Sequence, residues 1–291
     1  MNRVVRITPN GWELEADQRH VDIILDQLNL SGANGVRTPW EDEKKHEEEE
    51  NQRPLEGADA RRYRELAARA NYLAQDRADI QFATKEVCRG MCRPTKGDLK
   101  KLRRLARYLI SVPRVVLKYT YQDRQQNICG YSDSDFAGCR ITAKSTSGGV
   151  IMNGGHYLKS WSSTQKTVAL STGEAELTAL VKCSCELIGM TQLASDWGID
   201  LQGDVMVDSS AAIGVVKRKG AGKLSVGQLW IQEKAENEEL RYHKVKGSEN
   251  PADMLTKGLN WSDITKYMND MKQEVRTARA EKGLDMATGV R

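Results

Sequence analysis

The feature that most constrains this chain is an ordered series of short β segments and helices between residues 127 and 260. Alternating or short apolar runs bounded by glycine-rich turns predict strands, and apolar residues at three- and four-residue steps predict helices. The predicted elements are strands over 128–133, 147–155 and 156–163, a helix over 172–198, a strand over 205–208, a helix over 209–216, a strand over 240–246 and a last helix from 252. This order predicts an α/β fold, a five-stranded mixed sheet flanked by helices.

Four acidic residues sit where these predicted elements begin or end. Asp133 ends the first strand and Asp208 ends the fourth, Glu176 lies in the first turns of the long helix, and Asp253 opens the last helix. Because strand ends and helix starts meet at one edge of such a sheet, the four carboxylates can converge. Converged carboxylates repel one another unless a cation compensates them, and oxygen ligands suit Mg²⁺ or Mn²⁺. We therefore expect two Mg²⁺ ions, replaceable by Mn²⁺, that clamp a phosphodiester.

Each acid has a simpler explanation when it is taken alone. Asp133 suits a turn, Asp208 suits the cap of a helix start, and Asp253 is an acid favoured by a helix dipole. The prediction therefore rests on the joint pattern of the four residues.

A strongly basic block precedes the predicted α/β segment. Residues 61–128 hold 17 Lys and Arg against 6 Asp and Glu. Within it, apolar residues at helical spacing over 96–109 predict a helix with one buried stripe. Its other faces carry Lys100, Lys101, Arg103, Arg104 and Arg107. Such a surface can lie along a phosphate backbone, although an ordinary solvated helix is the alternative.

The remaining segments complete the expected organisation. We expect residues 1–40 to be part of something larger, 41–56 to be an acidic disordered linker, 57–126 to be a helical basic segment, 127–260 to be the α/β domain and 261–291 to be a helical or disordered tail. No run approaches the roughly 20 apolar residues that span a bilayer, and the N-terminus lacks the apolar core of a signal peptide. These absences favour an intracellular protein that is not secreted, with no membrane partner and six reduced cysteines. Cys88 and Cys92 suit half of a metal site or, more simply, two thiols on one helix face.

Six sequence blocks, in this order, resemble the ribonuclease H domain of copia-type (Pseudoviridae) retrotransposon Pol polyproteins. They are Tyr131-Ser-Asp-Ser-Asp-Phe-Ala-Gly138, Lys144-Ser-Thr-Ser-Gly-Gly149, Ser160-Trp-Ser-Ser-Thr-Gln-Lys166, Ala169-Leu-Ser-Thr-Gly-Glu-Ala-Glu-Leu177, Val207-Asp-Ser-Ser210 and Glu249-Asn-Pro-Ala-Asp-Met-Leu-Thr-Lys257. Looser matches at 67–72, 77–82 and 102–109 resemble the connection between reverse transcriptase and ribonuclease H, and 12–39 resembles the end of the polymerase palm.

The resemblance implies a ribonuclease H-like fold and metal-dependent endonucleolytic hydrolysis of the RNA strand of RNA–DNA hybrids. It assigns the catalytic and metal-binding roles to Asp133, Glu176, Asp208 and Asp253. Glu176 is preferred to Glu174 because the Leu and Ala that follow it fit the family helix. Contacts to the nucleic-acid backbone are implied for Lys144, Ser145 and Thr146. The rest of a Pol polyprotein is an implied partner, and the oligomeric state stays open.

Some departures from the family pattern keep alternatives open. The polymerase signature Tyr-x-Asp-Asp is absent, so we expect no polymerase activity. The stretch 222–227 lacks the usual basic and histidine residues, and His243 falls within a predicted strand, where a structural role is expected. A catalytically silent nucleic-acid-binding remnant is therefore one alternative. Another is a nuclease with the same core, such as an integrase or resolvase, that acts on duplex DNA.

Overall fold

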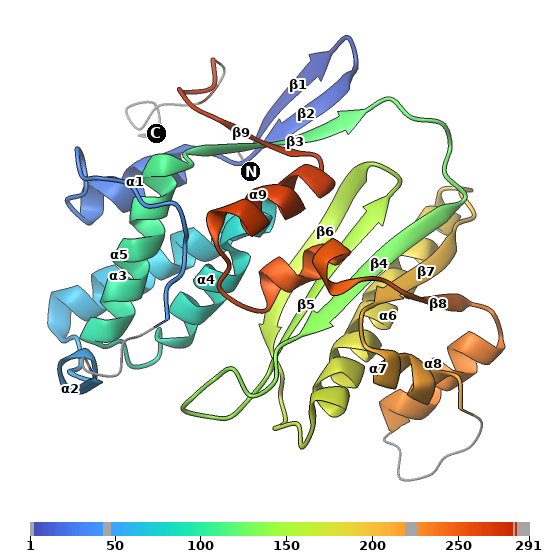
Figure 1. Ribbon diagram of the computed structural model, residues 1–291. Helices are drawn as coiled ribbons and strands as arrows, with labels where there is room; N and C mark the ends of the chain where they lie inside the picture. Colours follow the sequence, from blue (N-terminus) through green and yellow to red (C-terminus); the bar gives the residue numbers. More distant parts are fainter. Residues whose placement is uncertain (1–2, 43–47, 219–225, 282, 284–291) are drawn as a thin grey trace. The chain divides into compact units, whose positions relative to one another are not determined.

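The computed structural model describes residues 3–42, 48–218, 226–281 and 283 (Figure 1). The chain divides into two compact units. Unit 1 comprises residues 1–119 and 258–291, and unit 2 comprises residues 120–257. Unit 1 thus contains the predicted segment 1–40, most of the predicted segment 57–126 and the part of the chain after the predicted α/β domain. Only residues 120–126 of the second segment belong to unit 2.

Unit 2 contains the predicted five-stranded sheet. Its strands are β4 (Asn127–Ser134), β5 (Thr146–Asn153), β6 (His156–Thr164), β7 (Gln202–Val207) and β8 (Leu240–Lys244). They lie in the order β6-β5-β4-β7-β8, with β5 antiparallel to both of its neighbours and β7 parallel to both β4 and β8. An antiparallel meander followed by two parallel strands on its far side is the ribonuclease H-like arrangement, which confirms the predicted fold class.

Helices cover one face of this sheet, and a short turn of helix packs on the other. The helices are α6 (Thr172–Asp196), α7 (Ser210–Val216) and α8 (Val226–Glu236), and their apolar residues share one core with Ile128, Val205 and Leu240 of the sheet. Gly130 of β4 lets α6 approach, because a Cβ there would lie 2.9 Å from Cys183 Sγ. On the opposite face lies the 3₁₀ helix η4 (Pro251–Leu255), which follows a shorter one, η3 (Gly247–Glu249).

Two details of unit 2 differ from the sequence prediction. The last helix from 252 is only the single 3₁₀ segment η4, capped by the side chain of Asn250, which accepts a hydrogen bond from the Ala252 amide. Helix α8 was not predicted, because its apolar residues do not follow a clear helical stripe. Most of the stretch 222–227, noted for its missing basic and histidine residues, lies outside the described residues.

Unit 1 combines a four-stranded sheet with helices. The strands are β1 (Val4–Thr8), β2 (Gly11–Glu15), β3 (Arg114–Thr120) and β9 (Gln273–Arg276), in the order β1-β2-β3-β9. The helices are α1 (Arg19–Gln27), α2 (Glu48–Asn51), α3 (Gly57–Leu73), α4 (Ala78–Arg89), α5 (Lys96–Ser111) and α9 (Trp261–Asp270), with a 3₁₀ turn η2 (Ala74–Asp76) between α3 and α4. No helix among the described residues is long and apolar enough to cross a bilayer.

Three elements of unit 1 depart from the sequence expectations. Strand β3 lies in the segment expected to be helical, and α2 lies in the expected disordered linker, of which 43–47 is outside the described residues. Strand β9 lies in the expected helical or disordered tail. β9 is only four residues long and mostly polar, so its sequence has no pattern that predicts a strand. It is a strand because it pairs with β3.

The predicted basic helix forms as α5. Thr95 caps its start, because its hydroxyl accepts from the Asp98 amide while the Asp98 carboxylate accepts from the Thr95 amide. Leu102, Leu105 and Leu109 are fully buried along one stripe. The apolar spacing therefore sets which face of α5 is buried and leaves the basic residues on the others.

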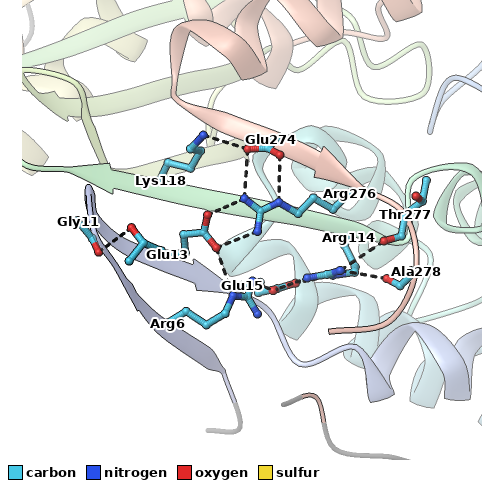
Figure 2. Close-up of polar contacts among 11 residues, drawn as sticks. Arg6, Gly11, Glu13, Glu15, Arg114, Lys118, Glu274, Arg276, Thr277 and Ala278 are labelled. Atoms are coloured by element: carbon cyan, nitrogen blue, oxygen red, sulfur yellow. Dashed lines mark hydrogen bonds and ion pairs between the residues drawn. The ribbon is translucent and has the colours of Figure 1, made fainter. Parts of the chain in front are cut away.

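Ion pairs and hydrogen bonds join β9 and the residues after it to β2 and β3 of the same sheet (Figure 2). The Arg114 guanidinium donates to both carboxylate oxygens of Glu15, at 2.8 and 2.7 Å, and to the carbonyls of Thr277 and Ala278. Arg276 of β9 donates to both oxygens of Glu13 on β2. Burial alone would raise the pKa of Glu15, but the neighbouring guanidinium groups hold that pKa below its usual value. Charge pairing therefore connects β2 with β3 and with the last strand of the unit, β9.

Replacing Arg114 with methionine should lower the free energy of unfolding by about 1.5–3 kcal/mol, because Glu15 loses two hydrogen bonds from a charged donor while Arg6 still pairs with it. The Glu15 side chain is only 2% exposed, so that water cannot replace the missing guanidinium. Urea denaturation of the full chain measures this change.

Lys118→Met is the matched control. Lys118 pairs with Glu274, but both side chains are more than 40% exposed. We expect a loss below about 1 kcal/mol for such a surface pair. Equal effects of the two substitutions would contradict the role given to Arg114.

Candidate metal and nuclease site

Three of the four predicted acids come together at one edge of the unit 2 sheet. Asp133 lies near the end of β4, Glu176 is in the second turn of α6, and Asp208 directly follows β7. One ligand oxygen from each lies within 4.8 Å of the others. The parallel pairing of β4 and β7 brings the two strand ends side by side, and the Ser171 cap fixes where α6 starts beside them.

The fourth acid, Asp253, lies close by but has a different partner. Its Oδ1 is 2.5 Å from Lys257 Nζ, one turn further along the chain. Asp253 is not part of the group of three whose oxygens share one small volume. Its charge nevertheless acts on Asp133, whose pKa it helps to raise. The structure therefore places Asp253 beside the cluster and leaves its predicted metal-binding role as a proposal.

Burial and mutual repulsion change the acidity of this cluster. Burial raises the pKa of Asp133 to about 7, with further increases from the charges of Asp253 and Asp208. Burial also raises the pKa of Glu176 to about 8, and the Asp133 and Asp208 charges add to this effect. Negative charge in this site is therefore poorly compensated by the protein itself.

The donor set suits a divalent cation. All three groups offer oxygen, the ligand that Mg²⁺ and Mn²⁺ prefer. Glu176 Oε2 is buried and has no hydrogen-bond partner, which is unusual for a native polar atom and is explained by a ligand. A metal bound here would supply the missing positive charge. Among the described residues, no other group of His, Cys, Asp and Glu is arranged in this way, and Cys88 and Cys92 are free thiols.

The choice between Glu174 and Glu176 is decided by their positions on α6. Glu174 Oε2 accepts a hydrogen bond from the Leu170 amide, so its carboxylate helps to cap the helix. Glu176 is buried and faces Asp133 and Asp208. The geometry thus agrees with the preference for Glu176.

Two residues expected to contact a nucleic-acid backbone lie in the interior. Ser145 is fully buried, and its hydroxyl accepts a hydrogen bond from the Ala137 amide. Thr146 is 3% exposed, and its amide donates to the Asp135 carboxylate. Both residues shape the loop after β4, so we no longer expect their side chains to touch a ligand. Lys144 is partly exposed and remains available.

The basic residues of α5 line a groove in unit 1. This groove, with a volume of about 440 Å³, is lined by Lys100, Lys101, Arg103, Arg104 and Arg107 together with Leu30, Glu41, Asp42, Asn51 and Gly97. Arg104 pairs with Glu41 and donates to Thr38 Oγ1 at 2.7 Å. Acidic residues therefore partly neutralise the positive charge of the groove, while Lys100 and Arg103 remain exposed.

Comparison with known proteins relates nearly the whole chain to retrotransposon proteins. It is 29% identical over 256 residues to the retrovirus-related Pol polyprotein from transposon TNT 1-94 of Nicotiana tabacum, covering 83% of this chain and 19% of that protein. It is 28% identical over 261 residues to the one from transposon RE1 of Arabidopsis thaliana, covering 87% and 17%. The relatives that match over 83–87% of this chain are copia-type retrotransposon Pol polyproteins.

The chain spans about a fifth of the length of these relatives. No family model matches it. Among solved structures, it is similar to a ribonuclease H1 isolated from compost, with 20% identity, a TM-score of 0.35 and coverage of 50% of this chain and 99% of that one. The ribonuclease H-like fold of the chain rests on its strand order.

Sequence reasoning missed three polar residues beside the acids. Asn250, Thr256 and Lys257 each contact the strand or helical turn that carries a predicted acid. All three lie in the block Glu249–Lys257 that supported the family resemblance. The motif therefore marked these three residues as part of the block that supports the resemblance, but only the structure shows which groups their side chains contact.

Asp133→Asn should raise the melting temperature at pH 8 when divalent ions are removed with EDTA. The unfolded carboxyl loses its proton near pH 4, whereas the folded one keeps it to about 7. The folded state then binds more protons across this window, so this group lowers stability as pH rises through it. A neutral amide removes that cost, and the gain should be a few degrees, given roughly 2–4 °C per kcal/mol.

Differential scanning fluorimetry at pH 4 and pH 8 measures the effect, which should be small at the lower pH. Asp123→Asn removes an exposed acid of the same unit and should change little at either pH. A lower melting temperature for Asp133→Asn at pH 8 would contradict the uncompensated charge.

Proposed function

We propose that this chain is a ribonuclease H that hydrolyses the RNA strand of RNA–DNA hybrids with a divalent metal. The observation that carries the proposal is the cluster of Asp133, Glu176 and Asp208 at the sheet edge. Similarity to retrovirus-related Pol polyproteins supports the choice of substrate, and the six sequence blocks resemble the ribonuclease H domain of copia-type elements. The products would carry 5′-phosphate and 3′-hydroxyl ends.

The residues of the cluster would act together on one phosphodiester. Asp133, Glu176 and Asp208 would hold Mg²⁺ or Mn²⁺, with Asp253 completing a site for two ions. A bound divalent ion would stabilise the negative charge that develops on the phosphate oxygens and would make an attacking water more acidic. The carboxylates fix where that charge is stabilised, and the rigid strand ends keep them in place. Lys257, held by Asp253, adds a cation at the same edge.

The α5 groove would bind the backbone of the substrate. The groove presents cations over about two turns of one helix, from Lys100, Lys101, Arg103, Arg104 and Arg107. Interactions of this kind are independent of base sequence and weaken as salt rises. Selection of the RNA strand would depend on its 2′-hydroxyls. Lys144, on the loop after β4, would contact the same backbone.

The test of the proposal is cleavage of an end-labelled RNA–DNA hybrid with Mg²⁺ or Mn²⁺. Wild-type protein should cut only the RNA strand, and EDTA should stop it. Asp133→Asn and Glu176→Gln should each lower the rate by more than about 100-fold, beyond the roughly 10–100-fold typical of losing an outer partner of a metal site. Asp123→Asn is again the control.

Other outcomes would select the alternatives. Tight hybrid binding without cleavage by any variant would overturn the enzyme proposal and indicate a binding remnant. Cleavage of duplex DNA in preference to the hybrid would indicate a different nuclease with the same core.

Removing two exposed cations from the groove should weaken hybrid binding and its dependence on salt. For Lys100→Gln combined with Arg103→Gln, the slope of log affinity against log salt should fall by about 0.9 for each phosphate that the protein no longer neutralises. Fluorescence anisotropy at several salt concentrations measures the slope.

A control with the same change in net charge is Lys234→Gln combined with Lys266→Gln. These lysines pair with Glu239 and Asp270, outside the groove. If both double variants show the same fall in affinity and slope, net charge alone would explain binding, and the groove would have no special role.

A further inference from the structure

Gly148, in the block Lys144–Gly149, has a role in the site that the acids alone do not explain. Gly148 of β5 lies directly opposite Asp133 of β4. A Cβ at Gly148 would lie 2.8 Å from both the Ala252 carbonyl oxygen and Thr256 Cγ2. Only glycine therefore lets the η4 segment pack against the two strands at the level of Asp133.

The η4 segment is also held to β4 from its other end. Asn250 is fully buried, and its Nδ2 donates to the Ser132 carbonyl at 2.9 Å. Its Oδ1 accepts from the Ala252 amide at 3.2 Å. One side chain thus caps η4 and joins it to the residue before Asp133.

This packing brings Thr256 into contact with Asp133. Thr256 is 1% exposed, and its hydroxyl donates to Asp133 Oδ2 at 2.5 Å. The Asp253 carbonyl, at 3.0 Å, is the other acceptor near the hydroxyl. A hydroxyl has one proton and donates one hydrogen bond. The bond to the Asp133 carboxylate is the shorter of the two and has a charged acceptor, so it is the stronger one. The bond restricts rotation of the Asp133 carboxylate.

We propose that Thr256 is a positioning residue that orients Asp133 to receive the divalent ion, and that Gly148 is kept small to admit it. The proposal rests on the metal site of the proposed function. It gives Gly148 and the end of the block Glu249–Lys257 one shared role. Thr256 acts through Asp133 and needs no contact with substrate.

Two substitutions separate this role from simple packing. Thr256→Val keeps the shape and the methyl group near Gly148 but removes the hydroxyl. Thr256→Ser keeps the hydroxyl and removes the methyl group. Titration calorimetry with Mg²⁺ on the full chain at pH 8 measures metal affinity, and circular dichroism without metal checks the fold.

Thr256→Val should weaken Mg²⁺ binding by roughly 10–100-fold, the usual effect of losing an outer partner of a metal ligand, and Thr256→Ser should stay within about threefold of wild type. Hybrid cleavage should fall in the same order. If valine binds Mg²⁺ as tightly as wild type, if valine and serine lose affinity equally, or if wild type binds no Mg²⁺, the positioning role is overturned.

The experiment also separates this proposal from the proposed function. Weaker Mg²⁺ binding by Thr256→Val, with no hybrid cleavage even by wild type, would support the positioning role and reject the ribonuclease. Hybrid cleavage by wild type, with unchanged Mg²⁺ binding by Thr256→Val, would do the reverse.

Discussion

Burial raises the free energy of an ionised carboxylate unless a cation or several donors lie beside it. The chain meets this constraint in two ways. In unit 1, Arg114 donates to both oxygens of buried Glu15, and fully buried Arg77 pairs with Asp79. In unit 2, Asp133 and Glu176 are equally hidden from water, yet no guanidinium faces them among the described residues. Poorly compensated negative charge thus marks the Asp133–Glu176–Asp208 cluster as suited to an external cation.

The two arrangements have opposite consequences for acidity. Arginine pairing holds the pKa of Glu15 below its usual value, while the pKa of Asp133 rises to about 7. The first carboxylate strengthens the fold over the whole neutral range, and the second weakens it until a cation arrives. Carboxylates whose pKa is strongly raised, at a cost to stability, are typical of functional sites. Thr256 partly offsets this cost, because its hydroxyl donates to one of the two buried carboxylates, Asp133.

The sequence was most informative where local periodicity and tertiary packing agree. The five strands of unit 2, helix α6 and the buried stripe of α5 follow directly from apolar spacing. Strand β9 could not be predicted, because its order comes from pairing with β3, more than 150 residues away. The burial of Ser145 and Thr146 was equally hidden, since small polar residues in a loop look exposed until their partners are known. Of the four acids, three were correctly expected to meet, and only coordinates could show that Asp253 pairs with Lys257.

The chain leaves unit 1 after Tyr119 and returns to it at Gly258, so unit 2 is an insertion of 138 residues, 120–257. Strand β9 can join β3 only after this insertion has been synthesised. During translation, unit 1 must therefore wait with the β3 edge unpaired while the inserted domain emerges. Closing a disordered loop has an entropic cost that grows with the logarithm of its length. If the insertion folds first, less disordered chain separates β3 from β9, and this cost falls. The order of synthesis thus favours a protein in which the acid cluster is assembled before its neighbouring unit is complete.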